Sequence, residues 1–304
     1  MNRLLLGATA AVVLLATGCS ASPAGADADG APLPVVATTP QVADFVRTIG
    51  GSDVQVTQII KPGVDPHEYE PTPADLQAIA GAKLVVKNGV GLEKWLDPTI
   101  SSAGYRGPVV DAGQGVPVRV EDGNEQDPHI WHNPLNAKIM VAGIAKGLSA
   151  ADPGRSETFT RHLAAYTAEL DKLDAGNLAA WEKLAPGQRK LVTNHDAFGY
   201  YVDRYHLDFV GSVIPSMDTS AELSAEQLTD LVARIRATGV KAVFTESSLP
   251  PKTAAAIASR AGVQVIGGED ALYGDSLGPA GSPEATYLGA EEHNTRTIVT
   301  ALAG

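Results

Sequence analysis

Residues 159–187, FTRHLAAYTAELDKLDAGNLAAWEKLAPG, decide how this chain is organised. Apolar side chains recur along the stretch at the spacing of one helical face, and they are Phe159, Leu163, Tyr166, Leu170 and Leu173. The pattern stops near Pro186, because proline cannot continue a helix. We expect a helix of about 30 residues, or about 45 Å. That length favours a helix that links two lobes; a long packing helix inside one domain is the alternative.

Short β-branched runs alternate with amphipathic segments before this helix, and the alternation restarts after it. The expected strands lie at 33–37, 54–60, 84–87, 108–110, 190–194, 209–213, 240–246 and 263–267. The expected helices lie at 42–49, 73–82, 135–148 and 224–238, with a last helix from about Pro283. Strands that alternate with helices form mostly parallel sheets. The predicted fold class is α/β, with two lobes of mostly parallel sheets joined by one long backbone helix.

The N-terminus has the pattern of an export signal. Arg3 precedes an apolar run over 4–15, which is shorter than the ~20 residues of a membrane-spanning helix. The run leads into LATGC at 15–19, which resembles a bacterial lipobox, where the signal is cut before the cysteine and the thiol is acylated. Cys19 is the only cysteine of the chain, so no internal disulfide or thiolate metal cluster can form. An ordinary signal peptide with an incidental cysteine is the alternative.

Five segments make up the expected organisation. They are a lipoprotein signal peptide at 1–18, a flexible tether at 19–34, an N-terminal α/β lobe at 35–153, a linking helix at 154–186 and a C-terminal α/β lobe at 187–304. The tether is rich in Ala, Gly, Ser and Pro and has no apolar period. We therefore expect a protein on the extracytoplasmic face of the cell membrane, held there by lipid on Cys19.

Composition narrows the possible functions. The 304 residues are 44% hydrophobic and 19% charged, which suits a folded chain of about two domains. The formal net charge of −12 argues against a nucleic-acid partner, because phosphate binding needs clustered Lys and Arg. The sequence has no phosphate-cradling glycine loop and no GxSxG motif.

Three of the seven histidines and one aspartate lie in loops beside predicted strands and helices. They are His67 in KPGVDPHEYEPTP, His129 in DPHIWHNP, His195 in TNHDAF and Asp275 in LYGDSLG. Ligands of open α/β sheets bind at the carboxyl ends of strands. If the carboxyl ends of both sheets face each other, the four side chains converge in an interlobe cleft and can bind a divalent transition metal ion. Scattered structural histidines are the alternative.

The remaining histidines and one glutamate have weaker signals. We expect His162 and His293 to be solvated and His206 to be exposed or to cap a helix. His132 lies three residues after the second candidate histidine, and we favour a role other than metal ligand for it. Glu246, at the end of a predicted strand, could orient an imidazole by a hydrogen bond; a surface or capping role is the alternative.

Four stretches occur in a specific order, GVDPHEYEPTP, DPHIWHNP, TNHDAFGYY and LYGDSLG, with the long helix between the second and the third. Over residues 35–304 the chain therefore resembles the metal-specific solute-binding proteins of ABC importers, the zinc and manganese receptors of cluster A-I, or family 9. The resemblance implies that His67, His129, His195 and Asp275 are the metal ligands. It also implies two lobes joined by a backbone helix, with limited lobe motion.

The leading functional hypothesis is a receptor that captures Zn²⁺, or alternatively Mn²⁺, and delivers it to an ABC permease and its ATPase. We expect a monomer. We do not expect an enzyme, because four protein ligands leave no open position for a catalytic water. Three nitrogens and one carboxylate favour zinc, whereas the absence of histidine from the loop at 116–126 is unlike many zinc receptors. An exported metal-dependent hydrolase with Glu68 or Glu70 as base is the alternative. A surface-adhesin role, proposed for some relatives, would add to metal binding.

Overall fold

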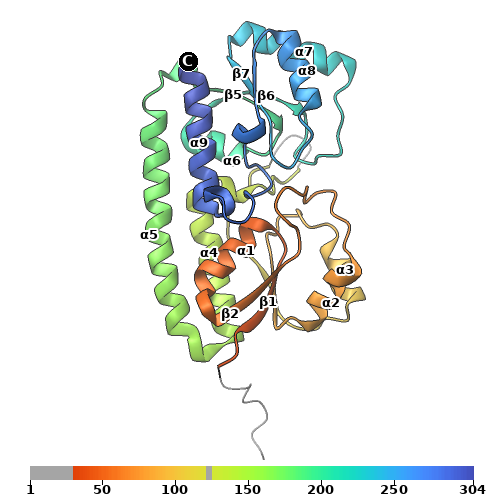
Figure 1. The fold of residues 1–304 in the computed structure, drawn as a ribbon, viewed down its shortest axis with the longest axis vertical. Coiled ribbons are helices and arrows are strands. Elements are labelled where there is room, and N and C mark those ends of the chain that lie inside the picture. The colour runs from red at the N-terminus through yellow and green to blue at the C-terminus, as the bar shows by residue number, and fades with distance from the viewer. Residues whose placement is uncertain (1–29, 121–124) are drawn as a thin grey trace, which may run out of the picture. The chain divides into compact units, whose positions relative to one another are not determined.

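The computed structural model describes residues 30–120 and 125–304 (Figure 1). The predicted signal peptide, Cys19 and the tether up to residue 29 lie outside these ranges. Residues Pro32–Gly304 form a compact unit of their own. Within the described ranges, every helix is too short or too polar to cross a bilayer.

The first lobe is built on a parallel sheet of four strands in the order β2-β1-β3-β4. The strands are β1 (Leu33–Ala37), β2 (Val54–Gln58), β3 (Leu84–Lys87) and β4 (Val109–Asp111). The helices are α1 (Pro40–Gly50), α2 (Pro73–Gly81), α3 (Leu96–Ser102) and α4 (Pro134–Ala151). Thr39 caps α1, and Thr72 forms a capping box with Asp75 at α2. These caps fix where each of the two helices begins.

The second lobe has two pairs of parallel strands, β5–β6 and β7–β8, with β5 lying beside β7. The strands are β5 (Lys190–His195), β6 (Asp208–Ile214), β7 (Ala242–Phe244) and β8 (Gln264–Ile266). The helices are α6 (Gly199–Tyr205), α7 (Ala225–Thr238) and α8 (Lys252–Ala261). Helix α7 begins with a capping box between Ser224 and Gln227, at the start of the helix expected over 224–238. The predicted strand at 240–246 is shorter as β7, although Glu246 still forms an isolated parallel bridge with Leu272.

Two helices connect the lobes. Helix α5 (Ser156–Trp181) carries Phe159 in the core of the first lobe and Trp181 in that of the second. It is 26 residues long, shorter than expected, because the chain turns at 182–184 before Pro186. Helix α9 (Tyr287–Ala303) lies beside α5 and also reaches both cores (Figure 1). It contributes Tyr287 to the first core and Ile298 to the second. The predicted class of two α/β lobes and a long linking helix is confirmed, and α9 adds a second connection.

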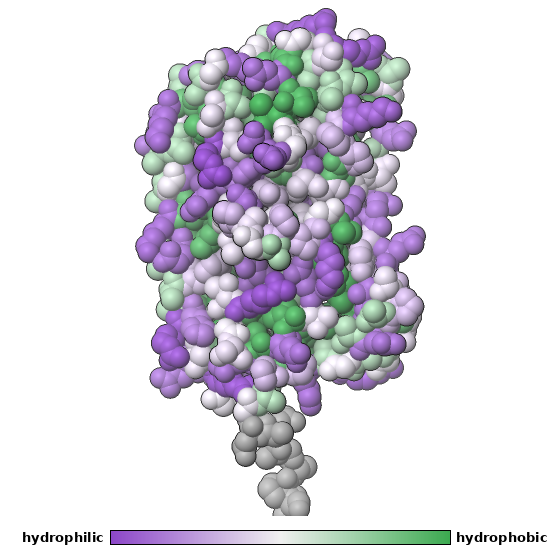
Figure 2. All heavy atoms as spheres, in the orientation of Figure 1, coloured by the Kyte–Doolittle hydropathy of each residue, from purple (hydrophilic) through white to green (hydrophobic). Residues whose placement is uncertain are grey.

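Apolar side chains fill the two cores, and hydrophilic side chains cover most of the face shown in Figure 2, around smaller hydrophobic areas. Two predictions about single histidines are wrong. His293 is 5% exposed, with Nε2 3.0 Å from the carbonyl oxygen of Ala271, because this face of α9 packs on the loop after β8. His162 is partly buried, with Nδ1 2.9 Å from the carbonyl oxygen of Ile49. His206 is exposed and ends α6 in the left-handed conformation, as expected.

Candidate metal centre

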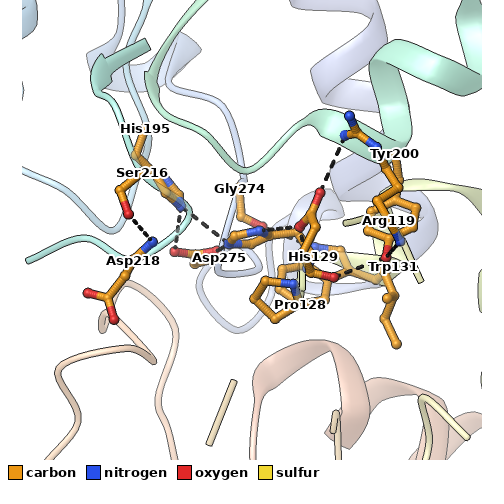
Figure 3. A network of polar contacts seen from close by, with 12 residues as sticks. Arg119, Pro128, His129, Trp131, His195, Tyr200, Ser216, Asp218, Gly274 and Asp275 are labelled. Atoms are coloured by element: carbon orange, nitrogen blue, oxygen red, sulfur yellow. Dashed lines mark hydrogen bonds and ion pairs between the residues drawn. The ribbon is translucent and has the colours of Figure 1, made fainter. Parts of the chain in front are cut away.

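The four side chains that the sequence singled out lie together in the described part of the chain. His67 belongs to the loop after β2, and His129 directly precedes the 3-10 turn Ile130–His132 that leads into α4. His195 is the last residue of β5, and Asp275 lies in the loop after β8. One ring nitrogen or carboxylate oxygen of each lies within 4.8 Å of the others. Figure 3 shows His129 and His195 directed toward Asp275.

Five of the six separations between the four groups are nearly equal. His129 Nε2 lies 3.3 Å from His67 Nε2 and 3.4 Å from His195 Nε2. The oxygens of Asp275 lie 3.4 Å from His67 Nε2 and 3.3 Å from both His129 Nε2 and His195 Nε2. Charge-assisted hydrogen bonds are shorter, about 2.7–2.9 Å. The four groups therefore surround a common centre and are not paired with one another by short hydrogen bonds.

Burial makes this arrangement costly without a cation. The side chains of His129, His195 and Asp275 are 0% exposed, and that of His67 is 4% exposed. Neither carboxylate oxygen of Asp275 accepts a hydrogen bond from the described residues. A buried charge or unsatisfied polar group is strongly unfavourable unless it is paired or coordinates a metal. The geometry thus favours an ion at the centre of the four groups.

Carboxylates also orient two of the imidazoles from behind. Nδ1 of His129 lies 2.8 Å from Asp127, and Nδ1 of His195 lies 2.8 Å from Glu246. Glu246 therefore occupies the position that the sequence suggested for an orienting partner. Asp127 was missed, although its place two residues before His129 was a usable signal. Such partners direct Nε2 of each ring toward the centre and make it a stronger ligand.

Asp127 is itself held in place by residues of both lobes. Arg119 Nη1 lies 3.4 Å from the Asp127 carboxylate. The Tyr200 hydroxyl, from α6, donates to the main-chain oxygen of Asp127 at 3.0 Å and accepts from the Arg119 N–H at 2.9 Å. The orientation of His129 therefore depends on packing between the lobes as well as on its own loop.

The carboxylates set the protonation of the metal-free site. Burial by itself lowers the pKa of His129, but Asp127 and Asp275 outweigh it and raise the pKa to about 10. Burial also lowers the pKa of His195, and Glu246 and Asp275 reverse this, so that the net shift is upward. Burial raises the pKa of Asp275, yet the neighbouring imidazoles hold it well below its usual range. In the metal-free site, protons therefore take the place of part of the cation's charge.

The side chains that were weighed as alternatives lie elsewhere. His132 is fully buried, with Nδ1 2.8 Å from Glu291 and its ring stacked on Phe198 at 4.4 Å, and it is not one of the four converging groups. Glu68 and Glu70 are exposed.

Comparison with known proteins defines the class. The family model described as "zinc-uptake complex component A periplasmic" matches residues 35–301, and the chain belongs to this family. It is a family of ABC-importer substrate-binding proteins, not of enzymes, so the hydrolase alternative is not favoured.

Three relatives are similar over nearly their whole length. The zinc-binding protein TroA of Treponema pallidum is 37% identical over 285 residues, which cover 91% of each chain. A solved TroA structure superposes with a TM-score of 0.84 at 34% identity and covers 90% of this chain and 99% of that one. The manganese-binding lipoprotein MntA of Bacillus subtilis is 31% identical and covers 99% of this chain and 100% of its own. The iron ABC transporter substrate-binding lipoprotein MtsA of Streptococcus pyogenes serotype M1 is 29% identical, with 99% and 98% covered.

Proposed function

We propose that this protein is an extracytoplasmic receptor that captures one divalent metal ion between its lobes. The proposed ligands are His67, His129, His195 and Asp275. The ion is cargo, and we propose that a monomer of this chain delivers it to an ABC permease and its ATPase. We also propose that the chain has the five segments predicted from the sequence. They are a signal at 1–18, a tether at 19–34, lobes at 35–153 and 187–304, and a linking helix at 154–186.

The spacing of the four groups is the observation that carries this proposal. Zinc binds imidazole nitrogen and carboxylate oxygen at about 2.0–2.1 Å, and a tetrahedron with such bonds has edges of about 3.3–3.4 Å. Five of the six separations among the four groups are 3.3 or 3.4 Å, and the chosen ligand atoms all lie within 4.8 Å of one another. Four protein ligands around one ion would fill a tetrahedral shell and leave no place for a reactive water, which suits capture and not catalysis.

We propose zinc as the preferred ion, because three nitrogens and one carboxylate suit it better than manganese, which prefers oxygen-rich shells. Zinc is expected to bind at least about tenfold (~1.4 kcal/mol) more tightly than manganese. His195→Glu should narrow this difference by replacing a nitrogen ligand with oxygen. Competition titrations of both ions on the native and variant proteins measure it.

The exposed His206 provides a matched control for this comparison. His206→Gln also removes an imidazole, but outside the site, and should leave the preference for zinc unchanged. Equal or tighter manganese binding by the native protein would refute the zinc assignment and leave the four-ligand site in place.

We further propose that lipid on Cys19 anchors the receptor, as the names of the lipoprotein relatives suggest for those proteins. Cys19→Ala is expected to abolish labelling by a fatty-acid probe and to move the protein from the membrane fraction to the soluble fraction. Cleavage before Cys19 predicts a mature native chain that begins there, which mass spectrometry checks. A variant that is still labelled, or a native chain that starts elsewhere, contradicts the proposal.

A further inference from the structure

The tripeptide Asp-Pro-His occurs twice at the candidate site, and the two copies use their aspartates differently. In both, the carboxylate accepts the main-chain N–H of the histidine, at 2.9 Å in Asp65–His67 and 3.0 Å in Asp127–His129. Asp127 also accepts from the ring of its own histidine. The second oxygen of Asp65 instead accepts a 2.6 Å hydrogen bond from the hydroxyl of Thr219. The Asp127 copy thus orients a histidine ring, whereas the Asp65 copy forms a contact with the other lobe.

Thr219 follows β6 and belongs to the C-terminal lobe, in a short segment, 216–219, that we call the clasp loop. A second contact from this loop reaches the N-terminal lobe, because Asp218 lies 2.7 Å from the ammonium of Lys94, which precedes α3. The N–H of Asp218 donates to the Ser216 hydroxyl at 3.1 Å, which shapes the loop (Figure 3). Two adjacent residues of one lobe therefore hold two separate segments of the other.

The clasp loop borders a cavity that reaches one of the four proposed ligands. A cavity of about 330 Å³ is lined by His67, Lys94, Met217 and Asp218 among others. His67 is the most exposed of the four proposed ligands, and Met217 is only 4% exposed. An ion that leaves through this cavity has to pass His67 and the clasp loop. The far end of the His67 loop is held separately, because the Gly63 N–H donates to the Ser276 hydroxyl at 2.7 Å.

We propose that Thr219 and Asp218 are positioning residues that keep the His67 loop closed over the metal and thereby set its dissociation rate. Thr219 acts through Asp65, and Asp218 acts through Lys94. The inference rests on the proposed function, because it takes His67 as a metal ligand. Both contacts join the two lobes, so they break when the lobes separate at this edge and are intact while the site is closed. Their loss should therefore speed release more than it slows capture.

The test is the rate at which the zinc-loaded full chain loses its ion to an excess of chelator in a stopped-flow experiment. Thr219→Val removes the hydroxyl but keeps the branched shape, and it should speed release about tenfold, the effect of losing a hydrogen bond to a charged group. Lys94 is 69% exposed, and Lys94→Met should speed release only about threefold, because exposed ion pairs contribute little. Thr219→Ser retains the hydroxyl and should restore nearly the native rate.

Matched controls separate this effect from general destabilisation. Lys138→Met breaks another surface ion pair of 2.7 Å, to Asp171, between α4 and α5. Thr229→Val removes a hydroxyl from α7 that bonds within its own helix. Both controls should release zinc at the native rate. In the absence of metal, Thr219→Val and Lys94→Met should melt at the same temperature as the native chain.

The outcomes also separate this inference from the function on which it rests. The inference would be overturned if Thr219→Val and Lys94→Met both release zinc at the native rate, or if the controls are accelerated equally. Zinc binding by the native protein would still stand. A native chain that binds neither zinc nor manganese would overturn the proposed function itself.

Discussion

Asp275→Asn is expected to weaken zinc binding by about 100- to 1,000-fold, because zinc sites release about 10–16 kcal/mol in total and this change removes one of four ligands. Asp275 is the only anion among the proposed ligands, and it lies 3.3–3.4 Å from the other three. The amide keeps the size of the carboxylate but not the charge that offsets part of the 2+ ion. Isothermal titration calorimetry gives the affinity of the native and variant proteins.

Asp270→Asn is the matched control for this substitution. Asp270 is exposed in the same lobe, five positions earlier in the chain, and it is not one of the four converging groups. The control should bind zinc as the native protein does, and circular dichroism should show that both variants are folded. If Asp275→Asn retains native affinity, the four-ligand site is wrong.

Zinc affinity is expected to fall steeply as the pH is lowered. The pKa of His129 is raised to about 10, so its ring is protonated at neutral pH in the metal-free protein. A coordinating imidazole must be neutral, and binding therefore releases this proton. Each displaced proton weakens binding about tenfold per pH unit, so the loss between pH 7.5 and 5.5 is about 100-fold or more. The upward shift at His195 acts in the same direction.

Calorimetry at one pH in two buffers with different protonation heats counts the protons released, and titrations across the pH range give the affinity. The stoichiometry should be one ion per chain. The zinc affinity of His206→Gln should change with pH as that of the native protein does, because His206 lies outside the site. An affinity that is flat from pH 7.5 to 5.5, or a binding heat that does not depend on the buffer, would contradict coordination by these imidazoles.

Local patterns in the sequence were sufficient for most of the fold. Helical spacing from Phe159 to Leu173 predicted the linking helix, and the helix expected at 224–238 is α7, which begins one residue later. Strand ends were less well predicted, as in β7, because beyond Phe244 the pairing partner changes from β8 to Leu272, which forms a bridge with Glu246. The crossing of α9 into the first core was also not predictable, since helical periodicity marks an apolar face but not the surface against which it packs.

The four proposed ligands could be chosen from the sequence because each lies in a loop or at the end of a strand and carries a side chain that can bind metals. The residues that hold these ligands in place could not all be identified from the sequence. Glu246 is 51 positions from His195, and Thr219 is 154 positions from Asp65, so only the folded chain brings these pairs together. His132 lies outside the four converging groups, and its pairing with Glu291 on α9 has no local signal in the sequence.

The position of Tyr287 has a consequence for when the chain can fold. The strands of the N-terminal lobe end at Asp111, yet its core includes Tyr287, in the last helix of the chain. Ribosomes add residues from the N-terminus, and domains usually fold as they emerge. Tyr287 follows all the strands of the C-terminal lobe, so the first lobe lacks a fully buried aromatic ring until those strands have been synthesised. Completion of the N-terminal core is therefore coupled to the synthesis of the C-terminal lobe, and the two lobes cannot finish folding one after the other in chain order.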